Sequence, residues 1–413
     1  MRRILVAALA VPLVVVPVST AEAAGPSTTV VCGQTLTAST RLANDLLNCQ
    51  GNGLVIAASG VTIDLAGHAI DGVNTPGSQG VVVDGHANVR IENGTITDFF
   101  VNGVGLHDAP HATVTKLRIR RIGAGGLPGD SSAGVLVQSS PGSVVMGSTV
   151  TNSVAAYQAD GVDVISSPGT LVADNDLSRN AWDGMFVLNS PRSRVLNNRL
   201  AQNMNHGLEV NYGSNSIKVL GNQAWGNAVN GIVVGALAHG VISNNVLTGN
   251  GYAGLFCFDL VDSRVSGNAA TGNAFGILLT GGQSGSMGNT VTLNRTNRNG
   301  LGGLLLVSAA NDNSVVGNTA NENQGVPGQG GGIVVLGSAG NLLDGNVANR
   351  NVGAGITVFE QAPGDSAGNV LKANLANKNT AHGIAAIDGT VDAGGNTAHG
   401  NTPAPNCLGV VCS

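Results

Sequence analysis

An internal repeat constrains the fold of this chain more than any other feature of its sequence. A glycine followed by an apolar residue recurs every 23 or 24 residues through the middle of the chain, at Gly161, Gly184, Gly207, Gly231 and Gly254. Asparagines stand nine and four residues before most of these glycines. Short apolar runs broken by Asn and Gly are typical of strands and turns, without helical periodicity. The repeat therefore predicts a parallel β-solenoid in which each repeat forms one coil.

The spacing within a repeat predicts where its side chains point. After the anchor glycine Gly231, the apolar residues Ile232 and Val234 stand one and three positions on. Because a strand alternates its side chains between two faces, these residues are expected to stack inward. The asparagines of the turns are expected to bond to their own backbone and to the asparagine one coil above, as a ladder.

With this repeat, the chain resembles the right-handed parallel β-helix proteins, the pectin-lyase-like superfamily that includes pectate lyases and polygalacturonases. The resemblance implies an all-β fold in which residues 51–400 form a single right-handed parallel β-helix. It does not fix an activity, because this superfamily contains many chemistries.

The first residues have the pattern of a secretory signal peptide, residues 1–23. Arg2 and Arg3 precede an apolar stretch from Ile4 to Val18, and Ala21-Glu-Ala23 is a cleavage site of small residues. We expect cleavage after Ala23 and a secreted, extracellular, monomeric protein with no membrane span left in the mature chain.

Residues 24–50 are predicted to cap the open N-terminal end of the solenoid. Ser39 and Thr40 are expected to start a short amphipathic helix that carries Leu42, Leu46 and Leu47 on one side.

Four of the five cysteines lie near the two ends of the predicted solenoid. Cys32 and Cys49 flank the expected helix, and Cys407 and Cys412 lie in a C-terminal tail, residues 401–413. In an exported protein both pairs are expected to form disulfides. Cys257 remains unpaired and is expected to be a small buried apolar residue.

Three consecutive repeats place a chemically active residue directly before the anchor glycine: Asp160, Asp183 and His206. Adjacent strands lie about 4.8 Å apart, so these residues should form a line along one side of the solenoid. Asp163 and Glu209 occupy outward positions two residues after the glycine. Crowded carboxylates raise one another's pKa, so one can act as an acid while its neighbour stays a base.

Aromatic residues gather in the same repeats, although they make up only 3% of the chain. Those nearest the acidic residues are Tyr157, Trp182, Phe186 and Tyr212. Flat apolar rings with a polar edge are a usual platform for sugar rings. The cluster therefore predicts a glycan cleft whose substrate contacts also include Asp163 and Glu209.

The order of motifs resembles that of polygalacturonases. The stretches 159–163, 182–184 and 205–207 each match part of a polygalacturonase motif on successive coils. The resemblance implies Asp183 as general acid, Asp160 as the residue that activates water, and His206 in support. Where that family has Arg-x-Lys, this chain has Val233-Val-Gly235, so the clamp for a substrate carboxylate is absent.

Other interpretations of these residues remain open. Asp-Gly is a common turn pair, so Asp160 and Asp183 could be turn residues, and the protein a non-catalytic glycan-binding or structural solenoid. A lyase would instead use calcium bound by carboxylates of the cluster, together with a base. The residues considered as that base are Arg179, Arg192 and Lys218. Apart from such a calcium ion no cofactor is expected, since the eight histidines are scattered.

The charge pattern bears on which kind of macromolecule the protein binds. A net charge of -5 and the lack of a long basic run argue against nucleic acid. One short stretch alternates basic and apolar residues, with Lys116, Arg118 and Arg120 on one face of a strand. It is interpreted either as a solvated face or as a contact for the carboxylates of an acidic polysaccharide.

Overall fold

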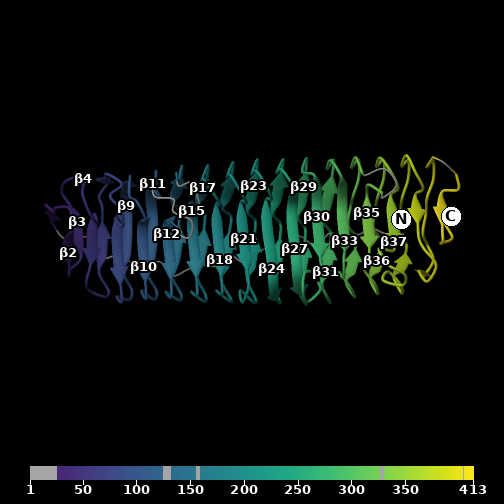
Figure 1. The fold of residues 1–413 in the computed structure, drawn as a ribbon, viewed down its shortest axis with the longest axis horizontal. Coiled ribbons are helices and arrows are strands. Elements are labelled where there is room, and N and C mark those ends of the chain that lie inside the picture. The colour runs from purple at the N-terminus through teal and green to yellow at the C-terminus, as the bar shows by residue number, and fades with distance from the viewer. Residues whose placement is uncertain (1–25, 124–131, 155–158, 326–329, 403) are drawn as a thin grey trace, which may run out of the picture.

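The computed structural model describes residues 26–123, 132–154, 159–325, 330–402 and 404–413. All regular elements in these ranges are β-strands, and they wind into a long rod of stacked coils (Figure 1). The expected signal peptide and Tyr157 lie outside the described residues. The described part of the chain has no helix of the length and hydropathy needed to cross a bilayer.

One sheet of 16 strands runs along the whole rod and joins strands of successive coils. Its strands are β2 (Gln34–Leu36), β5 (Leu54–Ile56), β8 (Val81–Asp84), β10 (Asn102–His107), β12 (Ser132–Gln138), β15 (Ala159–Ile165), β18 (Met185–Leu188), β21 (Leu208–Asn211), β24 (Ile232–Ala238), β27 (Ala253–Val261), β30 (Phe275–Thr280), β33 (Gly302–Val307), β35 (Ile333–Leu336), β37 (Ile356–Phe359), β39 (Ile384–Ala385) and β41 (Cys407–Leu408).

The other 25 strands belong to a second sheet, which bends at a corner and covers the rest of the rod. They are β1 (Ser27–Thr28), β3 (Thr40–Leu42), β4 (Leu46–Cys49), β6 (Thr62–Asp64), β7 (Ala69–Gly72), β9 (Arg90–Thr97), β11 (Thr113–Arg120), β13 (Val144–Met146), β14 (Thr149–Thr151), β16 (Leu171–Ala173), β17 (Asp176–Ser178), β19 (Arg194–Leu196), β20 (Arg199–Ala201), β22 (Lys218–Leu220), β23 (Gln223–Trp225), β25 (Val241–Ser243), β26 (Val246–Thr248), β28 (Arg264–Ser266), β29 (Ala269–Thr271), β31 (Thr290–Thr292), β32 (Arg295–Asn297), β34 (Ser314–Val316), β36 (Leu342–Asp344), β38 (Val370–Lys372) and β40 (Val391–Asp392).

The anchor glycines are required because successive coils approach each other closely. A Cβ atom on Gly184 would lie 2.6 Å from the carbonyl oxygen of Gly207, and one on Gly207 would lie 2.4 Å from that of Gly231. Real Cβ atoms do not come so close to a backbone oxygen, so any larger residue would push the coils apart. This contact explains why the repeat is marked by glycine.

The asparagine ladders are confirmed. In one of them Asn198 accepts hydrogen bonds at its Oδ1 from the backbone N–H and the Nδ2 of Asn175, both at 3.0 Å. Asn222 accepts the same two bonds from Asn198, at 2.9 and 3.1 Å. A second ladder runs through Asn180, Asn203, Asn227 and Asn250. These amides are buried, and each satisfies backbone groups that the turns leave without a strand partner.

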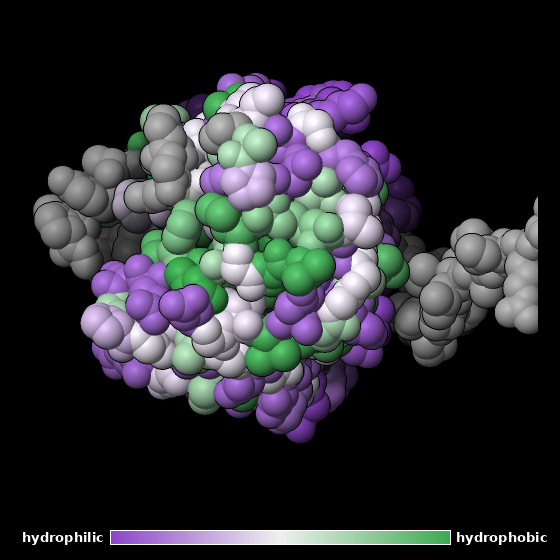
Figure 2. Space-filling view, turned by 90° about the vertical axis from the view of Figure 1, so that its right-hand side faces the viewer, coloured by the Kyte–Doolittle hydropathy of each residue, from purple (hydrophilic) through white to green (hydrophobic). Residues whose placement is uncertain are grey.

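Aliphatic side chains fill the rod from end to end. Val187, Val210 and Val234 stack in register on the inner face of the 16-stranded sheet, and each is fully buried. Figure 2 looks along the rod from its C-terminal end and shows apolar side chains in the middle, with hydrophilic ones around the rim. Cys257 lies within the core, as expected. Disulfides join Cys32 to Cys49 and Cys407 to Cys412.

The prediction of a short helix near the N-terminus is wrong. Residues 40–49 form strands β3 and β4, which pair with the next coil in parallel register. Leu42 and Leu46 are buried, but Leu47 is 59% exposed. The side chain of Asn44 bonds to the backbone N–H and C=O of Val30, at 2.9 and 3.0 Å, and fixes the turn between the strands. The spacing of Leu42 and Leu46 suits a helix, but it equally suits two strands separated by such a turn.

The ladder predicts that replacing Asn222 by Ala will strongly destabilise the protein. The substitution leaves the N–H of Asn198 and the carbonyl oxygen of Val195 buried without their partner. A buried unsatisfied group costs about 1–3 kcal/mol, so a loss of at least about 2 kcal/mol is expected from the urea midpoint. Gln223→Ala is the matched control, because this neighbouring amide is exposed. Equal midpoints for the two variants would contradict a structural role of the ladder.

Candidate functional site

A pocket of about 440 Å³ opens on the outer face of the 16-stranded sheet, over β15, β18 and β21. Four acidic side chains and two aromatic rings form most of its wall. The lining residues are Asp160, Asp163, Ile165, Trp182, Asp183, Phe186, Asn205, Glu209 and Asn211.

The parallel register explains how separate repeats build this pocket. Asp163 pairs with Phe186, and Phe186 pairs with Glu209, so these three residues form an outward stack on consecutive coils. Asp163 and Glu209 are thus two strand spacings apart, about 9.6 Å between their Cα atoms, with the ring of Phe186 between them. Glu209 is half-buried, whereas Asp163 is 2% exposed and lies at the floor.

The residues before the anchor glycines form a deeper line in which each side chain receives a backbone N–H from the next coil. Oδ1 of Asp160 accepts from the N–H of Asp183 at 2.7 Å. Oδ1 of Asp183 accepts from the N–H of His206, also at 2.7 Å. The line continues as Nδ1 of His206 accepts from the N–H of Asn230 at 3.2 Å. Asp160 lies within β15 and Asp183 just before β18, so each aspartate supports the backbone of the next coil and also lines the pocket.

The four carboxyl groups are arranged as two hydrogen-bonded pairs, Asp160 with Asp163 and Asp183 with Glu209. Burial raises the pKa of Asp160 well above its ordinary value, and the charge of Asp163 raises it further. Burial likewise raises the pKa of Asp183 to about 9, with the charge of Asp160 as the second cause. The hydrogen bond itself lowers the pKa of Asp163 and of Glu209, although burial raises both overall. These directions favour a proton on the aspartate before the anchor glycine in each pair, with its partner as the carboxylate that accepts the hydrogen bond.

Unpartnered oxygens support the protonated state. Oδ2 of Asp183 and Oδ1 of Asp163 are buried, and no donor among the described residues reaches them. A buried carboxylate oxygen without a donor is costly, so the cluster favours retained protons over four negative charges.

His206 is neutral in this environment, because burial lowers its pKa to about 4. Its Nδ1 accepts the N–H of Asn230, so the proton of the neutral ring is on Nε2. Nitrogen and oxygen atoms of His206, Asp183 and Glu209 lie within 4.8 Å of one another, a spacing that a metal ion can bridge. The tautomer, however, leaves His206 without a free lone pair for a metal, so the ring is suited to donating a hydrogen bond.

The structure brings together most of the predicted site residues. Asp160, Asp163, Trp182, Asp183, Phe186 and Glu209 all line the pocket. His206 lies beside it, within reach of Asp183 and Glu209. Tyr212 does not line the pocket, and its ring is 61% exposed in the turn after β21. Asn211 was not among the predicted residues, although its Nδ2 donates to Glu209. Its place two residues further along the same strand face was a usable signal.

The bases considered for a lyase lie elsewhere. Lys218 begins β22 in the other sheet, and Arg179 and Arg192 occupy left-handed turn positions. Among the described residues that line the pocket, none is a lysine or an arginine. The pocket thus has carboxyl chemistry and no cation to face a substrate carboxylate.

Comparison with known proteins identifies the fold. The family model "Right handed beta helix region" matches residues 52–224 and 150–296. A second model, "Periplasmic copper-binding protein (NosD)", matches residues 259–403, which include none of the pocket residues. No curated protein matches the chain.

Several solved structures are similar at low sequence identity. The catalytic unit of the GH87 α-1,3-glucanase from Streptomyces thermodiastaticus strain HF3-3 is 14% identical, with a TM-score of 0.52 over 89% of this chain and 63% of the glucanase chain. The A-module of the Azotobacter vinelandii mannuronan C-5 epimerase AlgE6 is also 14% identical, with a TM-score of 0.43 over 91% of this chain and 90% of that one. The periplasmic alginate epimerase AlgG is 14% identical, with a TM-score of 0.44 over 84% and 78%. At these identities the likeness shows the fold.

The protonated aspartate predicts a specific dependence of stability on pH. Between about pH 4 and pH 9 Asp183 keeps its proton when folded and loses it when unfolded. The unfolded state then binds fewer protons, so the free energy of unfolding falls as pH rises, by up to about 1.36 kcal/mol per pH unit.

Asp183→Asn should flatten this profile, because the amide mimics the protonated acid and its oxygen still accepts the N–H of His206. The variant is therefore expected to gain stability relative to wild type from pH 5 to about pH 8, measured by urea unfolding. Asp84→Asn, at the exposed end of β8, is the control and should run parallel to wild type. A parallel profile for Asp183→Asn would show that this aspartate is ionised in the folded protein.

Proposed function

The chain belongs to the right-handed β-helix family, and on that premise we propose that it hydrolyses glycosidic bonds of an uncharged polysaccharide in the carboxyl pocket. One observation supports this proposal above all: two carboxyl pairs, each with one aspartate whose pKa is strongly raised, lie beside two aromatic rings in one groove. The α-1,3-glucanase named above has the same fold, and it acts on a polysaccharide.

In the proposed reaction Asp163 and Glu209 contact the substrate, and Asp160 and Asp183 serve as their proton partners. Asp183 passes its proton to the carboxylate of Glu209, and Glu209 delivers that proton to the leaving glycosidic oxygen. The carboxylate of Asp163 takes a proton from the attacking water, whose oxygen bonds to the anomeric carbon. Inverting glycosidases hold their two carboxyls about 6.5–9.5 Å apart, and a separation of two strands is compatible with that range.

This assignment changes the roles that the polygalacturonase resemblance implies. Asp160 and Asp183 each commit one oxygen to a backbone N–H of the next coil, so we assign contact with the reacting atoms to Asp163 and Glu209. His206 keeps a supporting role: with its proton on Nε2, the ring can stabilise negative charge as it develops on the neighbouring carboxyls.

The substrate class follows from what lines the pocket. Trp182 and Phe186 offer ring faces for stacking against sugars. A uronic acid would place its carboxylate against the four acids, with no lysine or arginine among the described lining residues to neutralise it. The same reasoning favours hydrolysis over a calcium-dependent β-elimination, since a lyase also needs a base at the reacting carbon.

Location is part of this proposal. Two disulfides are typical of proteins that leave the cytoplasm, and residues 1–23 have the pattern of a signal peptide. We infer that the protein acts outside the cytoplasm, where polysaccharide substrates occur.

Single substitutions of the outward carboxyls test the reaction. Asp163→Asn and Glu209→Gln are each expected to lower kcat on a neutral glucan by about 10²- to 10⁴-fold, because general acid–base catalysis is lost. Release of reducing ends from a panel of α- and β-glucans, mannans and polyuronates is the assay, with unsaturated products followed at the same time and calcium added or chelated. Asp84→Asn should retain full activity.

Two results would contradict the proposal. Glycan binding by the wild type without any product would favour the alternative, a non-catalytic glycan-binding solenoid. Unsaturated products from a polyuronate that require calcium would place the carboxyls in a metal-binding role and make the protein a lyase.

The two tryptophans provide a matched test of the stacking platform. Trp182→Ala is expected to raise KM for the glucan about threefold to tenfold while kcat changes little, because a ring face for a sugar is lost. Trp225→Ala is the control, since Trp225 lies on the other sheet with the guanidinium of Arg199 4.7 Å from its ring centre. Equal effects of both substitutions would indicate a general loss of stability.

A further inference from the structure

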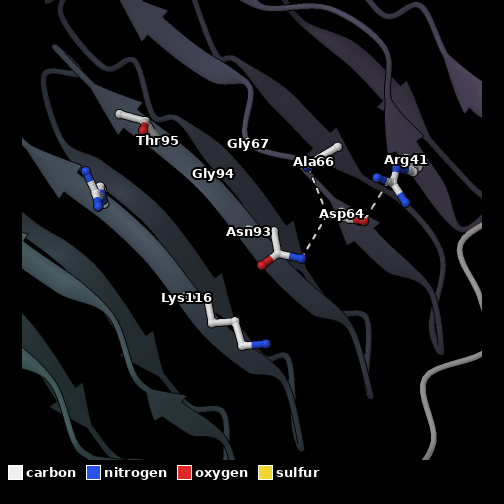
Figure 3. A pocket seen from close by; sticks show the side chains of 9 residues that line it. Arg41, Asp64, Ala66, Gly67, Asn93, Gly94, Thr95 and Lys116 are labelled. Carbon is white, nitrogen blue, oxygen red and sulfur yellow. Dashed lines mark hydrogen bonds and ion pairs between the residues drawn. The ribbon is translucent and has the colours of Figure 1, made fainter.

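A second groove, on the other sheet and nearer the N-terminal end of the rod, carries the opposite charge. It lies on the 25-stranded sheet near the N-terminal end, over β3, β6, β9 and β11, and encloses about 500 Å³. Figure 3 shows the groove with Arg41, Asp64 and Lys116 on its sides. The lining residues are Arg41, Asp64, Ala66, Gly67, Asn93, Gly94, Thr95, Lys116 and Arg118.

The negative charge in this groove is already neutralised. Oδ1 of Asp64 accepts hydrogen bonds from the backbone N–H of Ala66 at 2.8 Å and from Nδ2 of Asn93 at 3.3 Å. Its Oδ2 faces the guanidinium of Arg41 at 3.9 Å. Asp64 is therefore a buried structural acceptor, and the groove keeps a positive balance in a chain whose net charge is -5.

Lys116 and Arg118 are free to bind a ligand. Both are exposed, and within the described ranges neither has a carboxylate within 4 Å. Arg118 is directly in register with Thr95, whose hydroxyl adds a neutral donor to the same wall. Arg120, the third basic residue of this strand, does not line the groove.

The backbone at Lys116 is unusual for a lysine. Lys116 has a φ of 54° at the corner of its coil, a left-handed conformation that costs a non-glycine residue about 1–2 kcal/mol. Residues that favour this conformation hold the same corner in neighbouring coils; they are Asn93, Gly147, Asp174, Asn197 and Gly221. Lysine at this corner weakens the turn and adds a cation to the groove.

The floor of the groove is bare backbone. A Cβ atom on Gly94 would lie 2.3 Å from Cβ of Leu65 and 2.8 Å from the carbonyl oxygen of His68, so only glycine fits there. Ala66 and Gly67 add almost no side chain on the adjacent coil. A ligand can therefore lie close to the coils between the cations.

We propose that this groove binds the carboxylate groups of an anionic polysaccharide, at a site separate from the carboxyl pocket. Arg118 and Lys116 form charge-assisted hydrogen bonds to carboxylate oxygens, and Thr95 and Asn93 contact sugar hydroxyls. The register from Arg41 through Asp64 and Glu92 to Thr115 spans three strand spacings, about 14 Å, which a polymer can follow and a single small anion cannot. The described lining residues include no aromatic ring on which nucleic-acid bases could stack.

This inference does not rest on the proposed hydrolysis, because the two sites differ in sheet, charge and ligand. The protein would hold a carboxylated polymer with one face and present its pocket to an uncharged chain with another. Substitutions in the carboxyl pocket, such as Glu209→Gln, should leave binding at the groove unchanged.

The proposal is tested by measuring the binding of sodium polygalacturonate to the full protein with titration calorimetry at low salt. Arg118→Gln is expected to raise Kd about tenfold and Lys116→Asn about fivefold. Lys116→Asn should also keep or raise the unfolding midpoint, because asparagine suits the left-handed corner; weaker binding then cannot result from unfolding. Affinity should fall steeply as the Debye length shortens from about 30 Å at 0.01 M salt to about 8 Å at 0.15 M.

The repeat provides a matched control. The register of Arg118 continues along the sheet through Thr149, Asp176, Arg199, Gln223, Val246 and Ala269 to Arg295. Arg295 is thus an exposed arginine at the same position of a distant coil, and Arg295→Gln should change Kd less than about twofold.

Other ligands show which chemical group the groove recognises. Neutral dextran should not bind, and inorganic phosphate should compete only weakly. The proposal is overturned if Arg118→Gln binds polygalacturonate like wild type, or if Arg295→Gln weakens it equally. Tighter binding of dextran sulfate would reassign the groove to sulfate esters, and tighter binding of a single-stranded oligonucleotide would reassign it to nucleic acid.

Discussion

Buried asparagine side chains, stacked from coil to coil, hold the rod together at its corners. Every coil must turn corners, and each turn leaves backbone groups without a strand partner inside the rod. Stacked amides such as Asn198 and Asn222 satisfy these groups and also bond to one another. Each amide takes its position from the coil on either side, so the ladders fix the register of the coils that they join, from Asn175 and Asn180 onward. The anchor glycines then allow the coils to approach closely enough for the ladder to close.

The carboxyl pocket uses the same device with different side chains. Asp160 and Asp183 accept backbone N–H groups from the next coil, much as Asn230 does further along the line. A carboxyl has a second oxygen, however, and for Asp183 that oxygen is buried without a donor. Asp183 therefore supports the backbone of the next coil and also favours the protonated form of its carboxyl group. The outward residues Asp163 and Glu209 complete the two pairs and bring the acid chemistry to the open groove.

Much of this arrangement was predictable, and each failure has a physical cause. The in-register stack of Asp163 and Glu209 follows from the repeat, because parallel coils align equal positions. The helix expected around Leu42 and Leu46 failed because spacing alone does not separate a helical turn from two strands joined by a tight turn. Tyr212 was included as an aromatic near the acids, but it follows the end of β21 and points into solvent. Two of the three basic residues of β11 line the N-terminal groove, where a neighbouring coil contributes Arg41.

The pattern of residues along the chain is enough to predict the architecture, the coil that each residue belongs to, and the line of acids on one side of the rod. These follow from a period of 23 or 24 residues and from the alternation of strand faces, both of which are local properties of the chain. The folded coils were needed to tell which carboxyls favour the protonated form, which nitrogen of His206 carries the proton, and which cations of the N-terminal groove lack a carboxylate partner. Those properties depend on burial and on hydrogen-bond partners from neighbouring coils, such as the N–H that Asn230 donates to His206.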